Sequence, residues 1–150
     1  MRIAIGNDHA AVGLKRHLVE YLEGQGYDVI DLGQQTEERC DYPVFGQKVG
    51  LKVVNGEADC GILICGTGIG ISIAANKVPG VRCALCSEPV SARLARQHNN
   101  ANIVAMGART IGPAMAEGIV DVFLNTEFEG GRHQGRIDMF SAIEKGEVLE

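Results

Sequence analysis

A cysteine directly ahead of a glycine-rich segment is the part of this sequence best suited to chemistry. Cys65 ends an apolar stretch, and Gly66-Thr67-Gly68-Ile69-Gly70 follows it. A glycine-rich turn that opens a helix directs backbone amides at bound anions and favours the thiolate form of a nearby cysteine. Cys65 is therefore a candidate base or nucleophile beside an oxyanion site. A tight turn with a buried structural cysteine is the alternative that these residues leave open.

Other polar residues lie next to predicted strands. Ligands of open parallel sheets bind at the carboxyl ends of the strands, so we expect these side chains to gather with Cys65 in one site. Asp8 is equally suited to cap the helix that follows it, and His98 to end a helix. The candidates are Asp8 and His9 after the first strand, Asp41 and Tyr42 after the second, and Ser87 and Glu88 after the fourth. His98 and Asn99 precede the fifth strand, and Arg109 follows it.

Two arginines near the end of the chain have the spacing of an anion-binding pair. Arg132 and Arg136 are four residues apart in a glycine-rich segment, so they share one helical face if a helix begins there. Such a pair suits a phosphate or a carboxylate, and an ordinary charged surface is the alternative. The net charge of −5 argues against nucleic acid as a partner.

The scaffold for these residues follows from short apolar runs that alternate with longer amphipathic ones. The pattern predicts strands at residues 2–6, 27–32, 58–65, 82–86 and 102–106, with helices at 10–24, 42–54, 88–97, 110–124 and 135–145 and another opening after Gly70. We expect a single domain over residues 1–150 with a three-layer α/β/α, Rossmann-like fold: a five-stranded parallel sheet with helices on both faces and a C-terminal helix. That last helix has no strand after it, so we expect it to reach another subunit.

Composition excludes several classes of protein. Hydrophobic residues make up 45% of the chain and charged residues 22%, as in a globular protein rather than a disordered one. No apolar run approaches the roughly 18 residues of a membrane span, and the N-terminus lacks a signal-peptide pattern, so we expect a cytoplasmic protein. The five cysteines do not suggest a disulfide framework. Cys83 and Cys86 are spaced C-x-x-C, but in a strand they point to opposite faces, so we expect no metal site.

Together these motifs resemble the type B ribose-5-phosphate isomerases of the ribose/galactose isomerase family. The resemblance covers essentially the whole chain, with its specific blocks at Gly6-Asn7-Asp8-His9, Asp41-Tyr42-Pro43, residues 61–77, Arg96-Gln97-His98-Asn99 and Glu129-Gly130-Gly131-Arg132-His133. It implies an aldose–ketose isomerase that interconverts ribose 5-phosphate and ribulose 5-phosphate through a cis-enediolate, with no metal or other cofactor. It also implies a homodimer, or a tetramer, with active sites shared between subunits.

The resemblance gives each matching residue a role. Cys65 is the base that moves a proton between C2 and C1, Thr67 assists with the proton on the substrate oxygens, and His98 opens the furanose ring. Some family members instead carry an acidic base on the next helix, but Ala75 stands there in this chain. The remaining roles are enediolate stabilisation by the backbone of Gly66, Gly68, Ile69 and Gly70, sugar hydroxyl contacts from Asp8, Tyr42 and Asn99, and phosphate binding by His9, Arg109, Arg132 and Arg136.

Three alternative functions fit part of the pattern. Galactose 6-phosphate or allose 6-phosphate is the substrate of other members of the same family, although the full residue set here favours ribose 5-phosphate. A non-catalytic, flavodoxin-like phosphate-binding module needs neither Cys65 nor His98. A cysteine hydrolase would need Cys65 within hydrogen-bond reach of a histidine.

Overall fold

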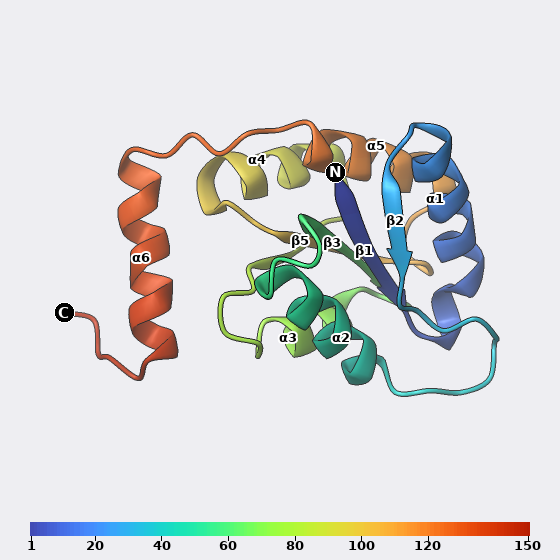
Figure 1. The fold of residues 1–150 in the computed structure, drawn as a ribbon, viewed down its shortest axis with the longest axis horizontal. Coiled ribbons are helices and arrows are strands. Elements are labelled where there is room, and N and C mark those ends of the chain that lie inside the picture. Colours follow the sequence, from blue (N-terminus) through green and yellow to red (C-terminus); the bar gives the residue numbers. More distant parts are fainter.

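The computed structural model describes residues 1–150, and its centre is a five-stranded parallel sheet (Figure 1). Its strands lie in the order β2-β1-β3-β5-β4. β3 is buried along its whole length because neighbouring strands and helices surround it, which explains its unbroken apolar sequence. The strands are β1 (Arg2–Asn7), β2 (Asp28–Asp31), β3 (Cys60–Cys65), β4 (Cys83–Leu85) and β5 (Ile103–Gly107).

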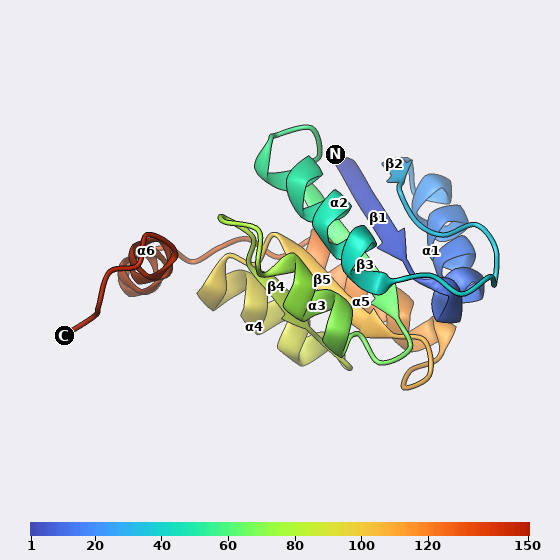
Figure 2. The same cartoon turned by 90° about the horizontal axis from the view of Figure 1, so that it is seen from below.

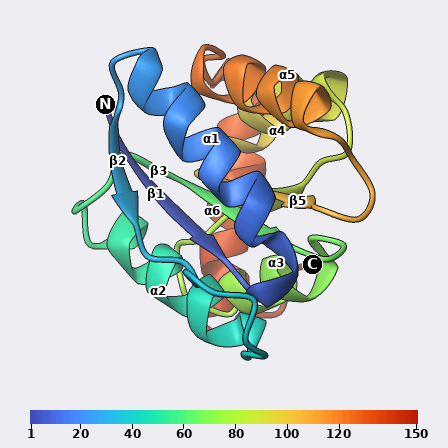
Figure 3. The ribbon, with the colours of Figure 1, turned by 90° about the vertical axis from the view of Figure 1, so that its right-hand side faces the viewer.

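Helices cover both faces of this sheet, which confirms the predicted three-layer fold (Figure 3). One face carries α1 (Val12–Gly24), α4 (Pro89–Asn99) and α5 (Pro113–Leu124), and the other carries α2 (Tyr42–Val54) and α3 (Ile69–Ala75). Each face buries its own apolar core, with Leu18 and Ile119 in the first and Phe45 and Ile71 in the second. Burial of each such side chain contributes about 1.5–3 kcal/mol, so the two cores fix the loops at the sheet's edges.

The two cysteines of the C-x-x-C pair point to opposite faces of the sheet, as predicted. Cys86 belongs to the core that packs under α1, α4 and α5, whereas Cys83 packs against the core under α2 and α3. Because the two thiols lie in different cores, they cannot jointly bind a metal ion. All five cysteines of the chain are free.

The C-terminal helix α6 (Arg132–Glu144) stands apart from the three layers (Figures 1 and 2). Only His133 and Ile137 are buried on it, and its exposed apolar side chains are Met139, Phe140 and Ile143. No helix of the protein has both the length and the apolar character needed to cross a membrane.

Some predicted boundaries were wrong, and local hydrogen bonds explain the differences. α6 begins three residues earlier than predicted, because the amides of His133 and Gln134 already donate to the carbonyls of Gly130 and Gly131. Arg132 and Arg136 therefore lie one turn apart within the helix. α5 begins at Pro113 rather than at residue 110, because the Thr110 hydroxyl closes a separate turn by donating to the Gly107 carbonyl at 3.0 Å. The strands predicted at 27–32, 58–65 and 82–86 are shorter in the structure.

Candidate active site

An open cleft of about 460 Å³ lies at the carboxyl ends of β1, β3 and β5. β1 pairs with β2 on one side and with β3 on the other. The chain leaves β1 toward one edge of the sheet and β3 toward the other edge. Ligands of α/β sheets bind at the point where the strand order reverses in this way. The structure thus brings together eight of the predicted site residues and adds Ile73 from α3. The residues that line the cleft are Asp8, Tyr42, Cys65, Gly66, Thr67, Ile69, Gly70, Ile73 and Arg109.

Cys65 forms the floor of this cleft at the last position of β3. Its side chain is buried, and the backbone amide of Gly68 donates a hydrogen bond to Sγ over 3.1 Å. Gly68 has a φ of 77°, and a Cβ there would lie within 3 Å of the Met106 backbone, so only glycine can present this amide. The sulfur therefore accepts a hydrogen bond from the backbone at the start of the glycine-rich segment. The geometry equips Cys65 to accept a proton from a bound substrate.

The remaining glycine-rich segment is fixed by the turn after β5 and by α2. The amide of Arg109 donates to the Gly66 carbonyl at 2.9 Å, and its guanidinium lies over Gly66. Tyr42 lies so close to Gly70 that a Cβ there would be 2.5 Å from the phenol ring. A cation, a phenol and the backbone of residues 66–70 therefore converge beside the cysteine. This arrangement suits an anionic, hydroxylated ligand.

Asp8 and His9 are both held in place from the end of β1. Asp8 is buried, and its carboxylate accepts a hydrogen bond from the Ala10 amide at 3.0 Å, so it caps a short 3-10 helix (His9–Ala11) that leads into α1 and not α1 itself. The amide of Cys40 donates to Nδ1 of His9 at 3.3 Å. A neutral imidazole that accepts at Nδ1 carries its hydrogen on Nε2. His9 is thereby set as a hydrogen-bond donor, which is what a phosphate oxygen requires.

Asn7 is a positioning residue that the sequence analysis missed. It is fully buried, and Nδ2 donates to the carbonyls of Asp8 at 2.7 Å and of Gln34 at 3.3 Å. Asn7 thus ties the loop after β2 to the loop that carries Asp8. The signal was available, because an amide side chain in an otherwise apolar strand needs buried partners.

His98 and Asn99 do not lie at the carboxyl ends of the strands with Cys65, where the sequence pattern had predicted them. Both lie in the last turn of α4, and the chain then enters β5 from its amino end, where the amide of Asn102 donates to the Arg82 carbonyl. Helices of α/β crossovers run antiparallel to the strands, so the C-terminus of α4 lies at the edge of the sheet opposite Cys65. Arg132 and Arg136 on α6 also lie away from the cleft, because α6 packs against α4.

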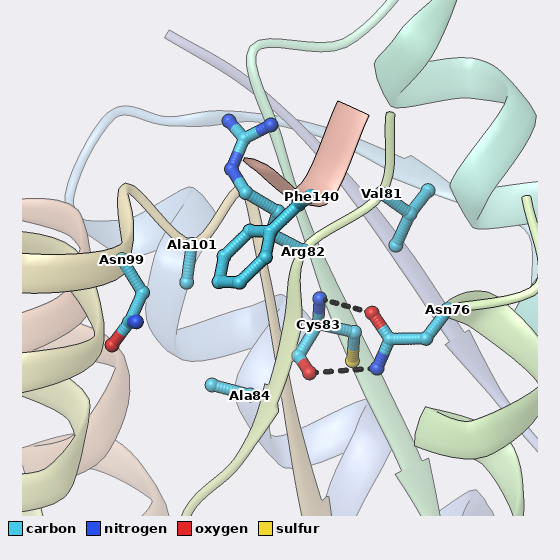
Figure 4. A pocket seen from close by; sticks show the side chains of 8 residues that line it. All are labelled: Asn76, Val81, Arg82, Cys83, Ala84, Asn99, Ala101 and Phe140. Atoms are coloured by element: carbon cyan, nitrogen blue, oxygen red, sulfur yellow. Dashed lines mark hydrogen bonds between the residues drawn. The ribbon is translucent and has the colours of Figure 1, made fainter. Parts of the chain in front are cut away.

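These residues form a second polar cluster at the amino edge of the sheet. The ring of His98 stacks on that of His133 with centroids 4.5 Å apart, and Glu129 lies beside both. Arg132 and Arg136 are exposed and form no ion pair. A hollow of about 300 Å³ opens between Asn99 and Phe140, next to Cys83 and Asn76 (Figure 4). The side-chain amide of Asn76 forms two hydrogen bonds with the backbone of Cys83.

Thiol alkylation should inactivate the protein through Cys65 alone. Burial raises the pKa of Cys60 and of Cys83 to about 12 and that of Cys86 to about 11, and it also raises the pKa of Cys40. Only the thiolate reacts quickly with iodoacetamide, so these four thiols should react slowly at neutral pH. We expect peptide mapping to place the inactivating label on Cys65 and a sugar phosphate to slow the labelling. Inactivation that accompanies labelling of Cys40 instead would contradict this prediction.

The chain is similar to known proteins along nearly its whole length. The family model described as Ribose/Galactose Isomerase matches residues 3–140. Ribose-5-phosphate isomerase B of Escherichia coli is 51% identical over 144 residues, which cover 96% of this chain and 97% of that protein. Galactose-6-phosphate isomerase subunit LacB of Clostridium acetobutylicum is 45% identical over 86% of this chain and 75% of its own.

A solved structure shows the same fold. Ribose-5-phosphate isomerase B of Clostridium thermocellum superposes with a TM-score of 0.96 at 52% identity, covering 97% of this chain and 99% of that one. The matching sequence blocks, the parallel sheet and these relatives lead to one conclusion. The chain is an isomerase that belongs to the ribose/galactose isomerase family.

Proposed function

We propose that this protein interconverts D-ribose 5-phosphate and D-ribulose 5-phosphate through a cis-enediolate, with Cys65 as the general base. The observation that carries the proposal is the Gly68 amide on the sulfur of Cys65, at the floor of a cleft that also holds Asp8, Tyr42 and Arg109. The names of the relatives from Escherichia coli and Clostridium thermocellum support this substrate. An assay with ribose 5-phosphate beside six-carbon sugar phosphates tests it.

The proposed chemistry moves one proton within the substrate. The Cys65 thiolate removes the proton from C2 of the open-chain aldose, and the electron pair forms the C1–C2 double bond of the enediolate. The backbone around residues 66–70 stabilises the negative oxygen, and the Thr67 hydroxyl shifts a proton from O2 to O1. Cys65 then returns its proton to C1, which gives the ketose. Since nothing is oxidised or reduced overall, we expect no cofactor.

A complete site in this proposal requires a second copy of the chain. His98, Asn99, Arg132 and Arg136 lie at the sheet edge opposite Cys65, and α6 exposes Met139, Phe140 and Ile143. A homodimer that covers this apolar face would bring the second cluster of one subunit to the cleft of the other. In this arrangement the histidine opens the furanose ring, Asn99 contacts a hydroxyl, and the arginines join His9 and Arg109 around the phosphate.

Two alternatives receive different support. Galactose 6-phosphate remains the second candidate substrate, because a relative with that name matches most of the chain. The cysteine hydrolase is disfavoured, since Sγ of Cys65 has the Gly68 amide and no histidine as its hydrogen-bond partner in the chain.

Replacing His98 with asparagine should separate ring opening from enediolate chemistry. Ribulose 5-phosphate stays open-chain because its C5 oxygen carries the phosphate, so exchange of its C1 proton with D₂O needs Cys65 but no ring opening. We expect His98→Asn to lower turnover of ribose 5-phosphate by about 10²–10⁴-fold, while C1 exchange in ribulose 5-phosphate, followed by NMR, stays nearly normal. Equal loss of both reactions would assign His98 a structural role.

A further inference from the structure

We propose that His133 and Glu129 are positioning residues, which hold the imidazole of His98 in the orientation that ring opening needs and beside a carboxylate. The inference rests on the proposed function and deepens it. It concerns a part of the Glu129-Gly130-Gly131-Arg132-His133 segment to which the proposed chemistry gives no role.

The stacking of the two imidazoles is the first observation. Their planes are only 14° apart with centroids at 4.5 Å, so each ring limits rotation of the other. The side chain of His133 is 6% exposed, whereas that of His98 is 39% exposed. The buried ring is therefore a fixed platform, and the exposed ring is the one a substrate can reach. Stacking of this kind contributes beyond the area it buries.

Glu129 connects both rings to the backbone of α4. Its amide donates to the carbonyl of Gln97, the residue before His98, at 3.1 Å. Its carboxylate oxygen Oε2 lies 3.5 Å from Nε2 of His133 and 4.0 Å from Nε2 of His98. One carboxylate thus faces two imidazoles, and the backbone hydrogen bond anchors the residue that carries it beside the end of α4.

The surroundings also disfavour a proton on the buried ring. Burial lowers the pKa of His133, and the nearby His98, Arg132 and Arg136 lower it further, against the opposite effect of Glu129. A proton on the buried ring of His133 is therefore disfavoured. Ring opening needs a group that gives a proton to the ring oxygen and takes one from the anomeric hydroxyl, so an exposed imidazole held beside an uncharged ring suits the task.

The same three side chains have the composition of a divalent metal site, and their ligand atoms lie within 4.8 Å of one another. However, a metal ion binds an imidazole nitrogen in the plane of the ring. Two stacked rings with nearly parallel planes cannot both place one ion in plane without leaving the stack. The stack therefore favours the positioning role over metal binding.

Variants at residue 133 separate the stacking face from the nitrogen atoms. His133→Phe keeps an aromatic face, whereas His133→Asn removes it. We expect His133→Asn to lower kcat for ribose 5-phosphate about 10–100-fold, the usual effect of a displaced catalytic group, and His133→Phe to recover most of that loss. C1 exchange in ribulose 5-phosphate should remain within about threefold in both. Gln134→Ala, on the exposed face of the same helix, is the matched control and should leave both reactions unchanged.

Glu129→Gln tests whether the negative charge of the Glu129 carboxylate acts on the imidazole of His98. Loss of the carboxylate disfavours protonated imidazole, so the pH profile of ribose 5-phosphate turnover should shift to lower pH while C1 exchange does not change. Each variant is first compared with the parent by thermal unfolding and by its size in solution, because His133 is buried.

Several outcomes would overturn this inference. Full turnover in His133→Asn, or parallel loss of turnover and C1 exchange in a variant that folds normally, would each do so. Zinc inhibition of the parent that disappears in variants with normal metal-free turnover would establish the metal site instead. The proposed function fails separately, because the parent protein would then show neither turnover of ribose 5-phosphate nor C1 exchange.

Discussion

Replacing Cys65 with alanine should abolish isomerisation while ribose 5-phosphate still binds nearly as well as to the parent protein. The sulfur lies at the floor of the cleft and accepts a hydrogen bond from the Gly68 amide. The carboxylate of Asp8 is already engaged by the Ala10 amide. General-base catalysis contributes about 10²–10⁴-fold, so kcat should fall by at least this factor. Binding, measured by calorimetry, should change little because the alanine removes no charged contact.

The same variant should also lose C1 proton exchange in ribulose 5-phosphate, since that exchange needs only the base. Cys65→Ser keeps the shape of the side chain, but its hydroxyl is far less acidic than a thiol and should restore little activity. Cys86→Ala is the matched control, because Cys86 is equally buried but lies in the core on the other face. Substantial turnover in either Cys65 variant would contradict the assignment of Cys65 as the general base.

The local parts of this site follow from sequence because they depend on short-range geometry. The apolar run that ends at Cys65 predicted a central strand, and the glycine after it predicted the turn that the structure contains. Asp8 was recognised as a helix cap from its position alone. In each case the interaction joins residues only a few positions apart, so residue type and spacing decide it.

Strand order could not be predicted in the same way. β5 lies between β3 and β4, although β4 precedes it in the chain. Parallel strands buried on both faces have similar apolar sequences, so their pattern says little about which neighbours pair. The choice depends on how the helices pack once the whole chain has folded.

The wrong position predicted for His98 has a different origin, namely the direction in which the chain runs through α4 and β5. A side chain at the end of a helix that precedes a strand lies at the amino edge of the sheet, whereas Arg109 follows its strand and lies at the carboxyl edge. Sequence order thus separates the two clusters within one chain. The sequence of one chain does not show how a second subunit would bring the two clusters together.

Removing both arginines of α6 should weaken substrate binding in the partner's cleft rather than in the cleft of the same chain. Arg132 and Arg136 are exposed, unpaired and one helical turn apart on an element that the sheet does not need. A charge-assisted hydrogen bond to a partly desolvated phosphate contributes roughly 1.5–3 kcal/mol, or about a tenfold change in affinity or more. We expect Arg132→Ala/Arg136→Ala to raise KM by about 10²–10⁴-fold with a smaller effect on kcat, and to make KM less sensitive to salt.

Mixing two inactive variants decides which subunit supplies these arginines. In a heterodimer of Cys65→Ala with Arg132→Ala/Arg136→Ala, a shared-site arrangement gives one intact site, with its cysteine from one chain and its arginines from the other. Random exchange of equal amounts makes half of the dimers mixed, so about a quarter of the parent activity should return at subsaturating substrate. Differently tagged chains and native mass spectrometry would confirm that subunits exchange. If mixed dimers form and no activity returns, each chain uses its own arginines, and α6 must then fold back toward its own Cys65 when substrate binds.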